Sequence, residues 1–465
     1  MLQHLPPALI NSLQSAPGFN EQSFVRTHES GEQVVSVRIN PAKVNTTGVL
    51  ADFRERLQIS TSVPWSSTGF YLKTRPSFTL DPTFHAGAYY VQDASSMFLE
   101  QVLTQTCALS EPLKILDLCA APGGKSTLIA SIMSVDSLLV SNELIKTRAN
   151  ILAENITKWG TANVVVTNND SRDFQKLTAF FDVIVVDAPC SGSGLFRKDP
   201  GAINEWSLNS VDQCSKRQEK ILSDILPSLK QDGILIYSTC SYSEREDEGI
   251  CDWLLSYPES SLESIQIKNE PEWAIVETLS VAGKCFGYRF YPDRLKGEGF
   301  FIAAFRKNST EKVITDNGRK AKPIMASKGE LLVLEKYIIE ASQYAFLKFN
   351  NEFLVIPQSI FPAVLQLIEL LYIRKAGVKA GTVIRDELVP DHELVLSNLM
   401  CPIFPLLEVD EVIALNYLRR KDFEIHTSLR GWAVTSYLGF AFGLVKILPS
   451  RINNYYPREW RIINK

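Results

Sequence analysis

The sequence predicts an α/β fold, in which a doubly wound and mostly parallel sheet is flanked by smaller regions at both ends of the chain. From Lys114 onward, short apolar strands alternate with longer helical segments, the pattern typical of such a sheet. The first of these strands runs into a turn of small residues that opens a helix. Two later strands have no helix between them, which indicates an antiparallel hairpin at the edge of the sheet.

The elements follow in order along the chain. The N-terminal part is mixed, with one clear strand at Val34–Ile39 that ends at Asn40-Pro41. The strands of the alternation are expected at Ile115–Leu118, Leu138–Ser141, Val164–Thr167, Val183–Asp187 and Ile234–Ser238. The helices are expected near Ser126–Met133, Ile145–Lys158, Val211–Leu229 and Glu244–Leu255. The hairpin strands are expected near Gly287–Tyr291 and Gly299–Phe305.

The length of 465 residues exceeds that of a typical single domain, so we expect two to four compact units. From Asn308 to Lys328 the apolar period is lost and polar residues dominate, which is typical of a linker. Further strands and helices after it indicate a second folded part. We divide the chain into an N-terminal region (1–108), a central α/β domain (109–307), a linker (308–330), an intermediate region (331–395) and a final region (396–465).

Composition excludes several classes of protein. With 45% hydrophobic and 22% charged residues the chain is neither disordered nor collagen-like. Eight cysteines without a C-x-x-C pair argue against a disulfide scaffold and a zinc finger, so we expect reduced thiols and no metal. The start of the chain does not resemble a signal peptide, and the apolar run Tyr437–Leu448 is too short to cross a bilayer. We therefore expect a cytoplasmic protein without a membrane partner.

Charge is distributed unevenly. The net charge of −4 argues weakly against a nucleic-acid partner, but Ser241–Glu272 alone carries nine acids against two bases. The remainder is therefore net positive, and from Glu411 to the end nine bases face four acids. Aromatic residues are interleaved with these bases, a mixture that suits a nucleic-acid surface as well as an ordinary solvated one.

The turn after the first strand is the strongest local motif. Its small residues let a ligand approach the backbone, and the following helix offers unpaired N–H groups. A P-loop is excluded because Cys119 stands where the motif requires glycine, and the dinucleotide motif G-x-G-x-x-G is absent. The turn consists of Cys119, Ala120, Ala121, Pro122, Gly123, Gly124 and Lys125.

Acids at the ends of the next two strands strengthen this interpretation. Glu143 follows the second strand, where a carboxylate can accept both hydroxyls of a ribose, and Asp170 follows the third, where it suits an adenine amine. Each alone is weak evidence, because acids at strand ends are more often helix caps. Their order after a glycine-rich turn that lacks a pyrophosphate site predicts S-adenosylmethionine as cofactor rather than NAD.

Two cysteines follow the fourth and fifth strands, in Asp187-Ala188-Pro189-Cys190 and in Thr239-Cys240-Ser241. Ligands of a doubly wound sheet lie outside the carboxyl ends of its strands, so both thiols are expected at one cleft. Cys119 lies in the turn after the first strand and is interpreted as a residue whose small size suits that turn. The other cysteines are interpreted as small buried hydrophobes: Cys107, Cys214, Cys251, Cys285 and Cys401.

A thiol suits methyl transfer to C5 of cytosine, because this carbon becomes a nucleophile only after a thiolate adds to C6. A base then removes the C5 proton and the thiol is expelled. Since a free cysteine with a pKa of about 8.5 is mostly protonated at neutral pH, the site must activate it. Asp187, beside N3 of the pyrimidine, can hold or donate a proton if burial raises its pKa.

These motifs resemble those of the Nol–Nop–Sun RNA cytosine-5 methyltransferases. The resemblance rests on residues 117–126, 187–194 and 238–241, and extends to further segments between Ser36 and Lys307. It implies a class I S-adenosylmethionine-dependent methyltransferase fold, Cys240 as the nucleophile that attacks C6, and Cys190 as the cysteine that helps to release the product. It also implies that Glu143, Asp170, Asp187 and the turn from Cys119 to Lys125 hold the cofactor.

The two ends of the chain point to a branch of this family. Only a short segment precedes Val37-Arg38-Ile39-Asn40, whereas a long extension follows the catalytic part. The end of this extension, residues 431–458, resembles the PUA-type RNA-binding module of the bacterial ribosomal small-subunit methyltransferase F group. The resemblance implies 16S rRNA within the small ribosomal subunit as partner, and we expect a monomer.

Other functions remain open at this point. A tRNA cytosine-5 methyltransferase would use the same chemistry on a different RNA. A catalytically idle RNA-binding or ribosome-assembly factor would keep the fold, although the presence of both Cys190 and Cys240 argues against it. A nucleotide hydrolase, suggested by Gly-Gly-Lys-Ser, lacks the rest of the P-loop.

Overall fold

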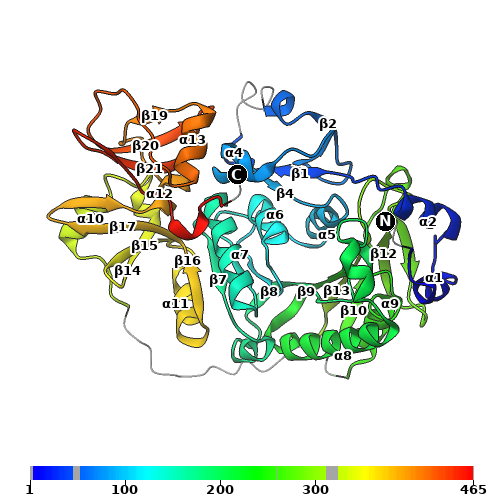
Figure 1. Cartoon of the computed structure of the whole chain (residues 1–465). Helices are drawn as coiled ribbons and strands as arrows, with labels where there is room; N and C mark the ends of the chain where they lie inside the picture. Colours follow the sequence, from blue (N-terminus) through cyan, green and yellow to red (C-terminus); the bar gives the residue numbers. More distant parts are fainter. Residues whose placement is uncertain (1–3, 45–52, 259, 310–322, 464–465) are drawn as a thin grey trace.

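The computed structural model describes residues 4–44, 53–258, 260–309 and 323–463, and its centre is a sheet of ten strands (Figure 1). The strands are β5 (Lys114–Asp117), β6 (Leu138–Asn142), β7 (Val164–Thr167), β8 (Phe181–Asp187), β9 (Leu229–Thr239), β10 (Leu262–Ile265), β11 (Val276–Leu279), β12 (Phe286–Phe290), β13 (Phe300–Lys307) and β16 (Ile373–Ala376). Their order across the sheet is β11-β12-β13-β9-β8-β5-β6-β7-β16, and β10 pairs with β13.

The five predicted strands of the alternation, β5 to β9, form the parallel middle of this sheet. Strand β13 joins them antiparallel to β9, and β12 pairs antiparallel with β13, which confirms the predicted hairpin. The sheet therefore has the doubly wound arrangement with a terminal hairpin that the sequence predicts.

Helices cover both faces of the sheet because its strands are apolar on both sides. In β8, Val183 and Val185 pack on the side of helices α5 (Leu99–Thr106), α6 (Gly124–Ile132) and α7 (Lys146–Trp159). Ile184 and Val186 pack on the opposite side, toward α8 (Leu208–Ile225), α9 (Glu248–Ser256) and α11 (Phe361–Leu370).

The helix predicted from Glu244 begins only at Glu248, which corrects its boundary. Residues before it form a turn closed by backbone hydrogen bonds, in which Glu246 N–H donates to Ser243 O over 3.0 Å. Glu246 and Asp247 have no exposed surface there, and Glu248 is 4% exposed. The strongly acidic stretch is therefore partly internal and does not form a continuous surface charge.

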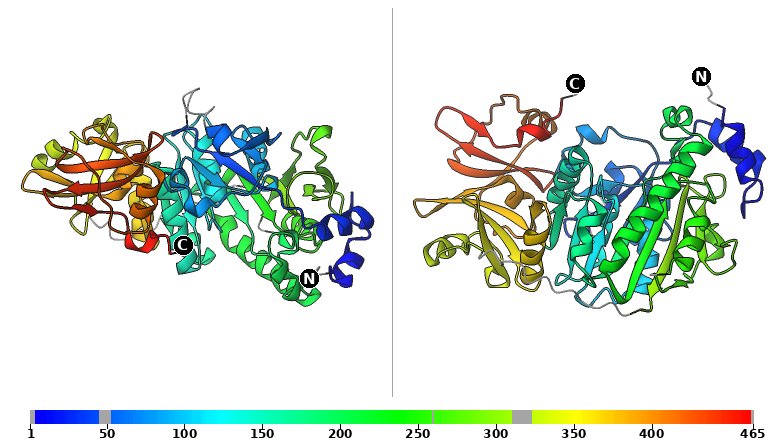
Figure 2. Two further views of the ribbon diagram at one scale, coloured as in Figure 1. Left: turned by 45° about the horizontal axis from the view of Figure 1, so that its top comes forward. Right: turned by 90° about the horizontal axis from the view of Figure 1, so that it is seen from below.

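The N-terminal region carries a four-stranded sheet in the order β2-β3-β1-β4. Its strands are β1 (Ser36–Ile39), β2 (Ile59–Ser62), β3 (Gly69–Leu72) and β4 (Tyr89–Val91), and its helices are α1 (Pro7–Leu13), α2 (Glu21–Glu29) and α4 (Pro82–His85). Helices α1 and α2, in dark blue, lie at the β12 side of the central sheet (Figures 1 and 2).

The C-terminal part, yellow to red, stands at the β7 side and contains two four-stranded sheets (Figures 1 and 2). The first sheet consists of β14 (Tyr344–Phe349), β15 (Glu352–Pro357), β17 (Val378–Ile384) and β18 (Glu387–Pro390). The second consists of β19 (Leu406–Glu408), β20 (Gly431–Tyr437), β21 (Phe440–Ile447) and β22 (Ile452–Asn454). Besides α11, its helices are α10 (Lys328–Leu334), α12 (His392–Leu396) and α13 (Glu411–Leu418). Residues 310–322 of the predicted linker lie outside the described residues.

Two packing relationships join segments that are distant in the sequence. Strand β16, from the range 331–395, extends the central sheet by pairing with β7. The final sheet and the N-terminal sheet share one hydrophobic core, in which Tyr417 and Phe442 belong to the same cluster as Val37 and Phe70. Among the described residues no helix is long and apolar enough to span a membrane.

Candidate active site

The turn after β5 brings small residues and a helix N-terminus to the carboxyl edge of the sheet. Gly123 has a φ of 121°, a backbone conformation that favours glycine, and α6 begins at the next residue. Beneath the turn, Ser126 Oγ donates to Asp117 Oδ2 over 2.7 Å. Burial raises the pKa of Asp117 to about 7, although the Ser126 bond opposes the shift.

The two predicted acids stand at the ends of β6 and β7. Glu143 is buried, accepts a hydrogen bond from Ile145 N over 2.9 Å and lies 3.4 Å from Arg148 Nη1. Asp170 caps the short 3₁₀ helix Ser171–Lys176, where it accepts from the backbone and the guanidinium of Arg172. These hydrogen bonds lower the pKa of Asp170. Asp170 is therefore a helix cap that also faces the pocket described next.

A pocket of about 830 Å³ opens at the carboxyl edge of the sheet and brings most of the predicted residues together. Cys119, Glu143, Asp170, Asp187, Cys190 and Cys240 all line it. Ala120, Ala121, Pro122, Gly123, Gly124 and Lys125 are not among its lining residues; they form the adjoining turn and the start of α6. The parallel strands thus bring the predicted site residues together at one edge of the sheet, as expected for this fold.

The two thiols contact each other. Cys190 Sγ and Cys240 Sγ are 3.1 Å apart, and each side chain is partly exposed. The hydrogen bond to Cys240, followed by burial, raises the pKa of Cys190 well above its usual value. Cys190 therefore keeps its proton and can donate it toward the sulfur of Cys240.

Lys125 and Asp187 form an ion pair beside the thiols. Lys125 Nζ lies 2.8 Å from Asp187 Oδ2, and Ser238 Oγ donates to Asp187 Oδ1 over 2.8 Å. Burial opposes the charge of Lys125, but Asp187 more than compensates and raises the lysine pKa. The Asp187 side chain is 35% exposed, so the burial on which its expected role as proton donor depends is not found.

Sequence reasoning missed Glu246, whose buried carboxylate connects the two cysteine loops. Glu246 accepts hydrogen bonds from Ser191 N over 2.7 Å, from Ser191 Oγ over 2.6 Å and from Ser241 Oγ over 2.6 Å. Ser191 follows Cys190 and Ser241 follows Cys240, so one side chain fixes both loops. The serine that follows each cysteine was a sequence signal for a shared hydrogen-bond acceptor. Glu246 lies in a run of acidic residues, so the sequence did not distinguish it from its neighbours.

Basic residues at the pocket were also missed. Arg148, Arg172, Arg217 and Lys220 line it, on helices α7 and α8 and on the short 3₁₀ helix after β7. Lys220 is paired with Asp224, Arg172 with Asp170 and Arg148 with Glu143. Each lies at a helical or loop position that periodicity alone treats as an ordinary solvated surface.

The remaining cysteines divide into two groups. Cys251 and Cys285 are buried as expected, whereas Cys107, Cys214 and Cys401 are partly exposed, which corrects their interpretation as buried hydrophobes. All eight thiols are free. The part of the chain that the structure describes contains no group of three or more His, Cys, Asp or Glu side chains suited to a metal ion.

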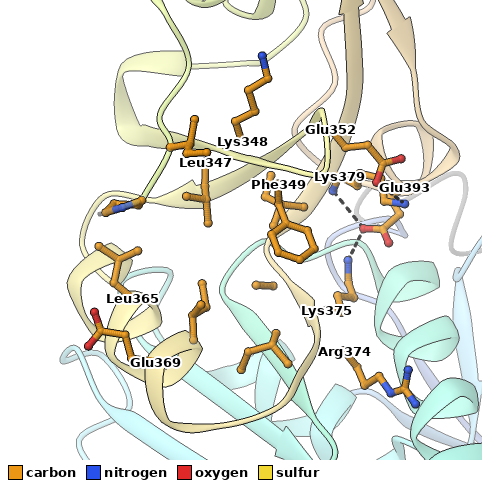
Figure 3. A pocket seen from close by; sticks show the side chains of 16 residues that line it. Leu347, Lys348, Phe349, Glu352, Leu365, Glu369, Arg374, Lys375, Lys379 and Glu393 are labelled. Atoms are coloured by element: carbon orange, nitrogen blue, oxygen red, sulfur yellow. Dashed lines mark hydrogen bonds and ion pairs between the residues drawn. The ribbon is translucent and has the colours of Figure 1, made fainter. Parts of the chain in front are cut away.

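A second pocket, of about 410 Å³, lies in the C-terminal part between α11, β14, β15 and β16 (Figure 3). Its wall is mostly apolar, with Leu347, Phe349 and Leu365 around it. Lys375 is paired there with Glu393, and Lys379 with Glu352. None of the residues that the sequence singled out for chemistry lines this pocket.

Three family models match the chain in separate segments. Residues 5–94 match the N-terminal domain of 16S rRNA methyltransferase RsmF, residues 104–306 match 16S rRNA methyltransferase RsmB/F, and residues 404–462 match the methyltransferase RsmF PUA domain. The final segment is thus a PUA-like domain, as its resemblance implied.

Known proteins agree with these matches. Ribosomal RNA small subunit methyltransferase F of Psychromonas ingrahamii is 31% identical, over 91% of this chain and 90% of that protein. A methyltransferase homolog protein of Pyrococcus horikoshii has a TM-score of 0.51 at 28% identity, over 65% of this chain and 100% of that one. NSun6 of the same organism, solved with SFG, has a TM-score of 0.54 at 19% identity, over 66% of this chain and 100% of that one, and supports the fold. The chain therefore belongs to the family of ribosomal RNA small subunit methyltransferase F, S-adenosylmethionine-dependent methyltransferases of 16S rRNA.

Proposed function

We propose that the protein methylates C5 of a cytosine in the 16S rRNA of the small ribosomal subunit, through a covalent bond between Cys240 and C6. The observation that carries this proposal is the contact of the Cys190 and Cys240 thiols, 3.1 Å apart, at a pocket lined by Glu143 and Asp170. A methyl transfer to an already nucleophilic atom, such as a ring nitrogen, requires no thiol. Two thiols at the carboxyl edge of the sheet suit methylation of a carbon that becomes nucleophilic only after a thiolate adds to the ring.

The roles of the two cysteines follow from their contact. Cys240 adds to C6 as the thiolate, and the raised pKa of Cys190 keeps a proton available for a hydrogen bond to the Cys240 sulfur. This bond stabilises the developing thiolate before attack. After the methyl transfer a base takes the C5 proton, the C5=C6 double bond re-forms and the Cys240–C6 bond breaks, so that Cys240 leaves as a thiolate. The protonated Cys190 is placed to stabilise this leaving thiolate by the same hydrogen bond.

Asp187 is proposed to position the base as a hydrogen-bond acceptor. Lys125 and Ser238 already donate to its two carboxylate oxygens, and its exposed part faces the same pocket as Cys190 and Cys240. The exocyclic amine of cytosine is a donor, and carboxylates are its usual partners in proteins. Uracil has a carbonyl at this position, so Asp187 would also discriminate between the two pyrimidines.

The pocket fits S-adenosylmethionine, which would supply the methyl group. The apolar side chains of Leu144 and Ile145 are 61% and 51% exposed although they line a pocket, so they offer uncovered surface for an adenine ring. Glu143 and Asp170 line the same pocket and offer acceptors for ribose hydroxyls and the adenine amine. Together with the turn from Cys119 to Lys125 and the N-terminus of α6, these are the residues proposed to hold the cofactor.

The division into regions at 108, 307, 330 and 395 is proposed as the functional organisation, with the PUA-like domain contacting RNA. The protein is proposed to act as a monomer in the cytoplasm, where its substrate is found. Trp432 supports the RNA contact, because Lys446 Nζ lies 4.9 Å from the centre of its ring and the Tyr455 ring lies 4.6 Å away.

Bisulfite sequencing of total RNA, from cells with and without the gene, tests the proposal. One 16S cytosine should lose protection from deamination when the gene is absent and regain it when wild-type protein is supplied, but not when Cys240→Ala is supplied. Loss of protection in a tRNA would instead support the alternative substrate. Unchanged protection in every RNA would contradict the proposed reaction.

A further inference from the structure

Strand β16 connects the C-terminal part to the catalytic sheet. It runs antiparallel to β7, with Ile373 opposite Thr167 and Ala376 opposite Val165. At its far end, Gly377 N–H donates to Val164 O over 3.3 Å. The β16 strand therefore covers what would otherwise be the open edge of the sheet at β7.

The near end of β16 contacts the loop that follows β7. The backbone of Tyr372 forms two hydrogen bonds with the side-chain amide of Asn169: Tyr372 N–H donates to Asn169 Oδ1 over 3.0 Å, and Asn169 Nδ2 donates to Tyr372 O over 3.1 Å. Asn168 N–H also donates to Tyr372 O, over 3.1 Å. Asn169 is 8% exposed, so displacement of the Tyr372 backbone would leave a nearly buried amide without these hydrogen-bond partners.

The same loop forms hydrogen bonds with residues 142–144 at the end of β6, which include Glu143 of the pocket. Asn168 Nδ2 donates to Glu143 O over 2.7 Å and to Leu144 O over 2.8 Å. The Asn142 side chain accepts from Asn169 N–H over 3.0 Å and donates to Asn169 O over 3.0 Å. A continuous set of hydrogen bonds thus leads from Tyr372 to the backbone of Glu143 and Leu144.

We propose that Tyr372 and strand β16 are a structural part of the cofactor pocket, and that Asn169 is the positioning residue through which the C-terminal part controls cofactor affinity. The inference rests on the proposed cofactor. Asn169, Asp170, Glu143 and Leu144 line the pocket, whereas Tyr372 does not, so Tyr372 acts only through the loop. A bound cofactor that needs this loop in place must in turn stabilise β16, because linkage between two sites is reciprocal.

Hydrogen–deuterium exchange of the unaltered full chain tests this reciprocity, with S-adenosylhomocysteine as the probe. Saturating probe should slow amide exchange severalfold in the turn 119–125 and in 372–376, while the hairpin of β17 and β18 should not change. Slower exchange in the turn without any change in 372–376 would overturn the inference and leave the proposed cofactor intact. No change in either segment would reject the proposed cofactor, and the inference with it.

A matched pair of variants at one position gives the second test. Tyr372→Pro removes the N–H that donates to Asn169, whereas Tyr372→Ala keeps this N–H and removes only an exposed ring, above which the Arg374 guanidinium lies at 5.1 Å. Calorimetric titration with S-adenosylhomocysteine should give an affinity about tenfold weaker for the proline variant and within about twofold of wild type for the alanine variant.

Wild-type affinity of both variants would overturn the inference. An equally weakened affinity of both variants would also overturn it. If the proline variant does not fold, Asn169→Asp replaces it. That variant keeps the Oδ1 acceptor for Tyr372 N–H, but it loses the donor to Tyr372 O and places a carboxylate against that carbonyl. It should bind the probe more weakly than Tyr372→Ala, with unchanged affinity for RNA, and wild-type probe affinity would contradict the proposal.

Discussion

Cys190 and Cys240 touch through their sulfur atoms, 3.1 Å apart, although fifty positions separate them in the chain. The contact follows from strand register: β8 and β9 are parallel neighbours in which Asp187 is opposite Ser238, so the two motifs leave the sheet side by side. The raised pKa of Cys190 keeps this thiol protonated beside the Cys240 sulfur, so the two cysteines are proposed to have different roles and different mutant phenotypes.

Cys240→Ala should reduce methylation by at least about a thousandfold, because the nucleophile is lost, and leave the affinity for S-adenosylhomocysteine within about twofold. Transfer of a labelled methyl group to 16S rRNA measures the first effect and calorimetry the second. Cys214→Ala is the matched control, since Cys214 is another partly exposed free thiol and should keep full activity. Turnover by the Cys240 variant would refute its role as nucleophile.

Cys190→Ala should allow attack on C6 but slow release, so that protein remains bound to RNA. A denaturing gel should show a band of lower mobility that disappears after ribonuclease treatment. The double variant Cys190→Ala/Cys240→Ala should not form this band, because the bond to RNA requires Cys240. A band that persists in the double variant would show that the bond to RNA does not require Cys240, and a band formed by Cys240→Ala in place of Cys190→Ala would reverse the two roles.

Glu246→Gln should lower kcat by roughly tenfold to a hundredfold with little change in KM, because an amide cannot accept all the hydrogen bonds that Ser191 and Ser241 donate to the carboxylate. The charge of Glu246 also contributes to the raised pKa of Cys190, so its removal should lower this pKa. Alkylation rates of the thiols as a function of pH should therefore rise at lower pH than in wild type. Glu244→Gln, in the exposed part of the same turn, is the control and should change neither quantity.

The role of Glu246 shows where sequence reasoning ends. Periodicity located β7 at Val164–Thr167 with the bounds that the structure has. The rule that ligands lie at the carboxyl ends of parallel strands correctly predicted that both cysteines share one pocket. The helix predicted from Glu244 starts later because Glu246 and Asp247 turn inward to bind loop atoms, and a helical pattern contains no information about such tertiary partners.

Long-range pairing was equally inaccessible from the sequence. Strand β16 pairs with β7 across more than two hundred positions of the chain, and no local pattern names its partner. The common core of the first and last sheets, with Val37 and Phe442 in one cluster, likewise depends on contacts between the two ends of the chain. Removal of the final domain would therefore expose the N-terminal core, so single surface substitutions are the better test of RNA binding.

Asp117→Asn should change the pH dependence of stability. The folded-state pKa of Asp117 is raised by burial to about 7, so the folded protein prefers the protonated carboxyl. Its stabilising contribution is therefore present at low pH and is lost as pH rises from the unfolded value of about 4 toward 7. The asparagine variant is neutral throughout. Its free energy of unfolding, relative to that of wild type, should therefore rise by up to roughly 2–4 kcal/mol as the pH is raised from about 4 to about 8.

Urea unfolding at a series of pH values measures this difference. Asp136→Asn, at an exposed position, is the control and should follow the wild-type curve. A difference between Asp117→Asn and wild type that is constant with pH would show that the carboxyl does not titrate in this range.

Lys446 and Tyr455 offer a way to separate charge from stacking in the PUA-like domain. Lys446 should contact an RNA phosphate, so Lys446→Gln should make the plot of log affinity against log salt concentration shallower by about 0.7 to 0.9. Tyr455, 40% exposed, should stack on a base, so Tyr455→Ala should lower the affinity at every salt concentration and leave the slope unchanged. Lys336→Gln, an exposed position on the intermediate region, should alter neither the slope nor the affinity. Identical slopes for Lys446→Gln and wild type would exclude a phosphate contact at Lys446, and an unchanged affinity of Tyr455→Ala would exclude stacking at that ring.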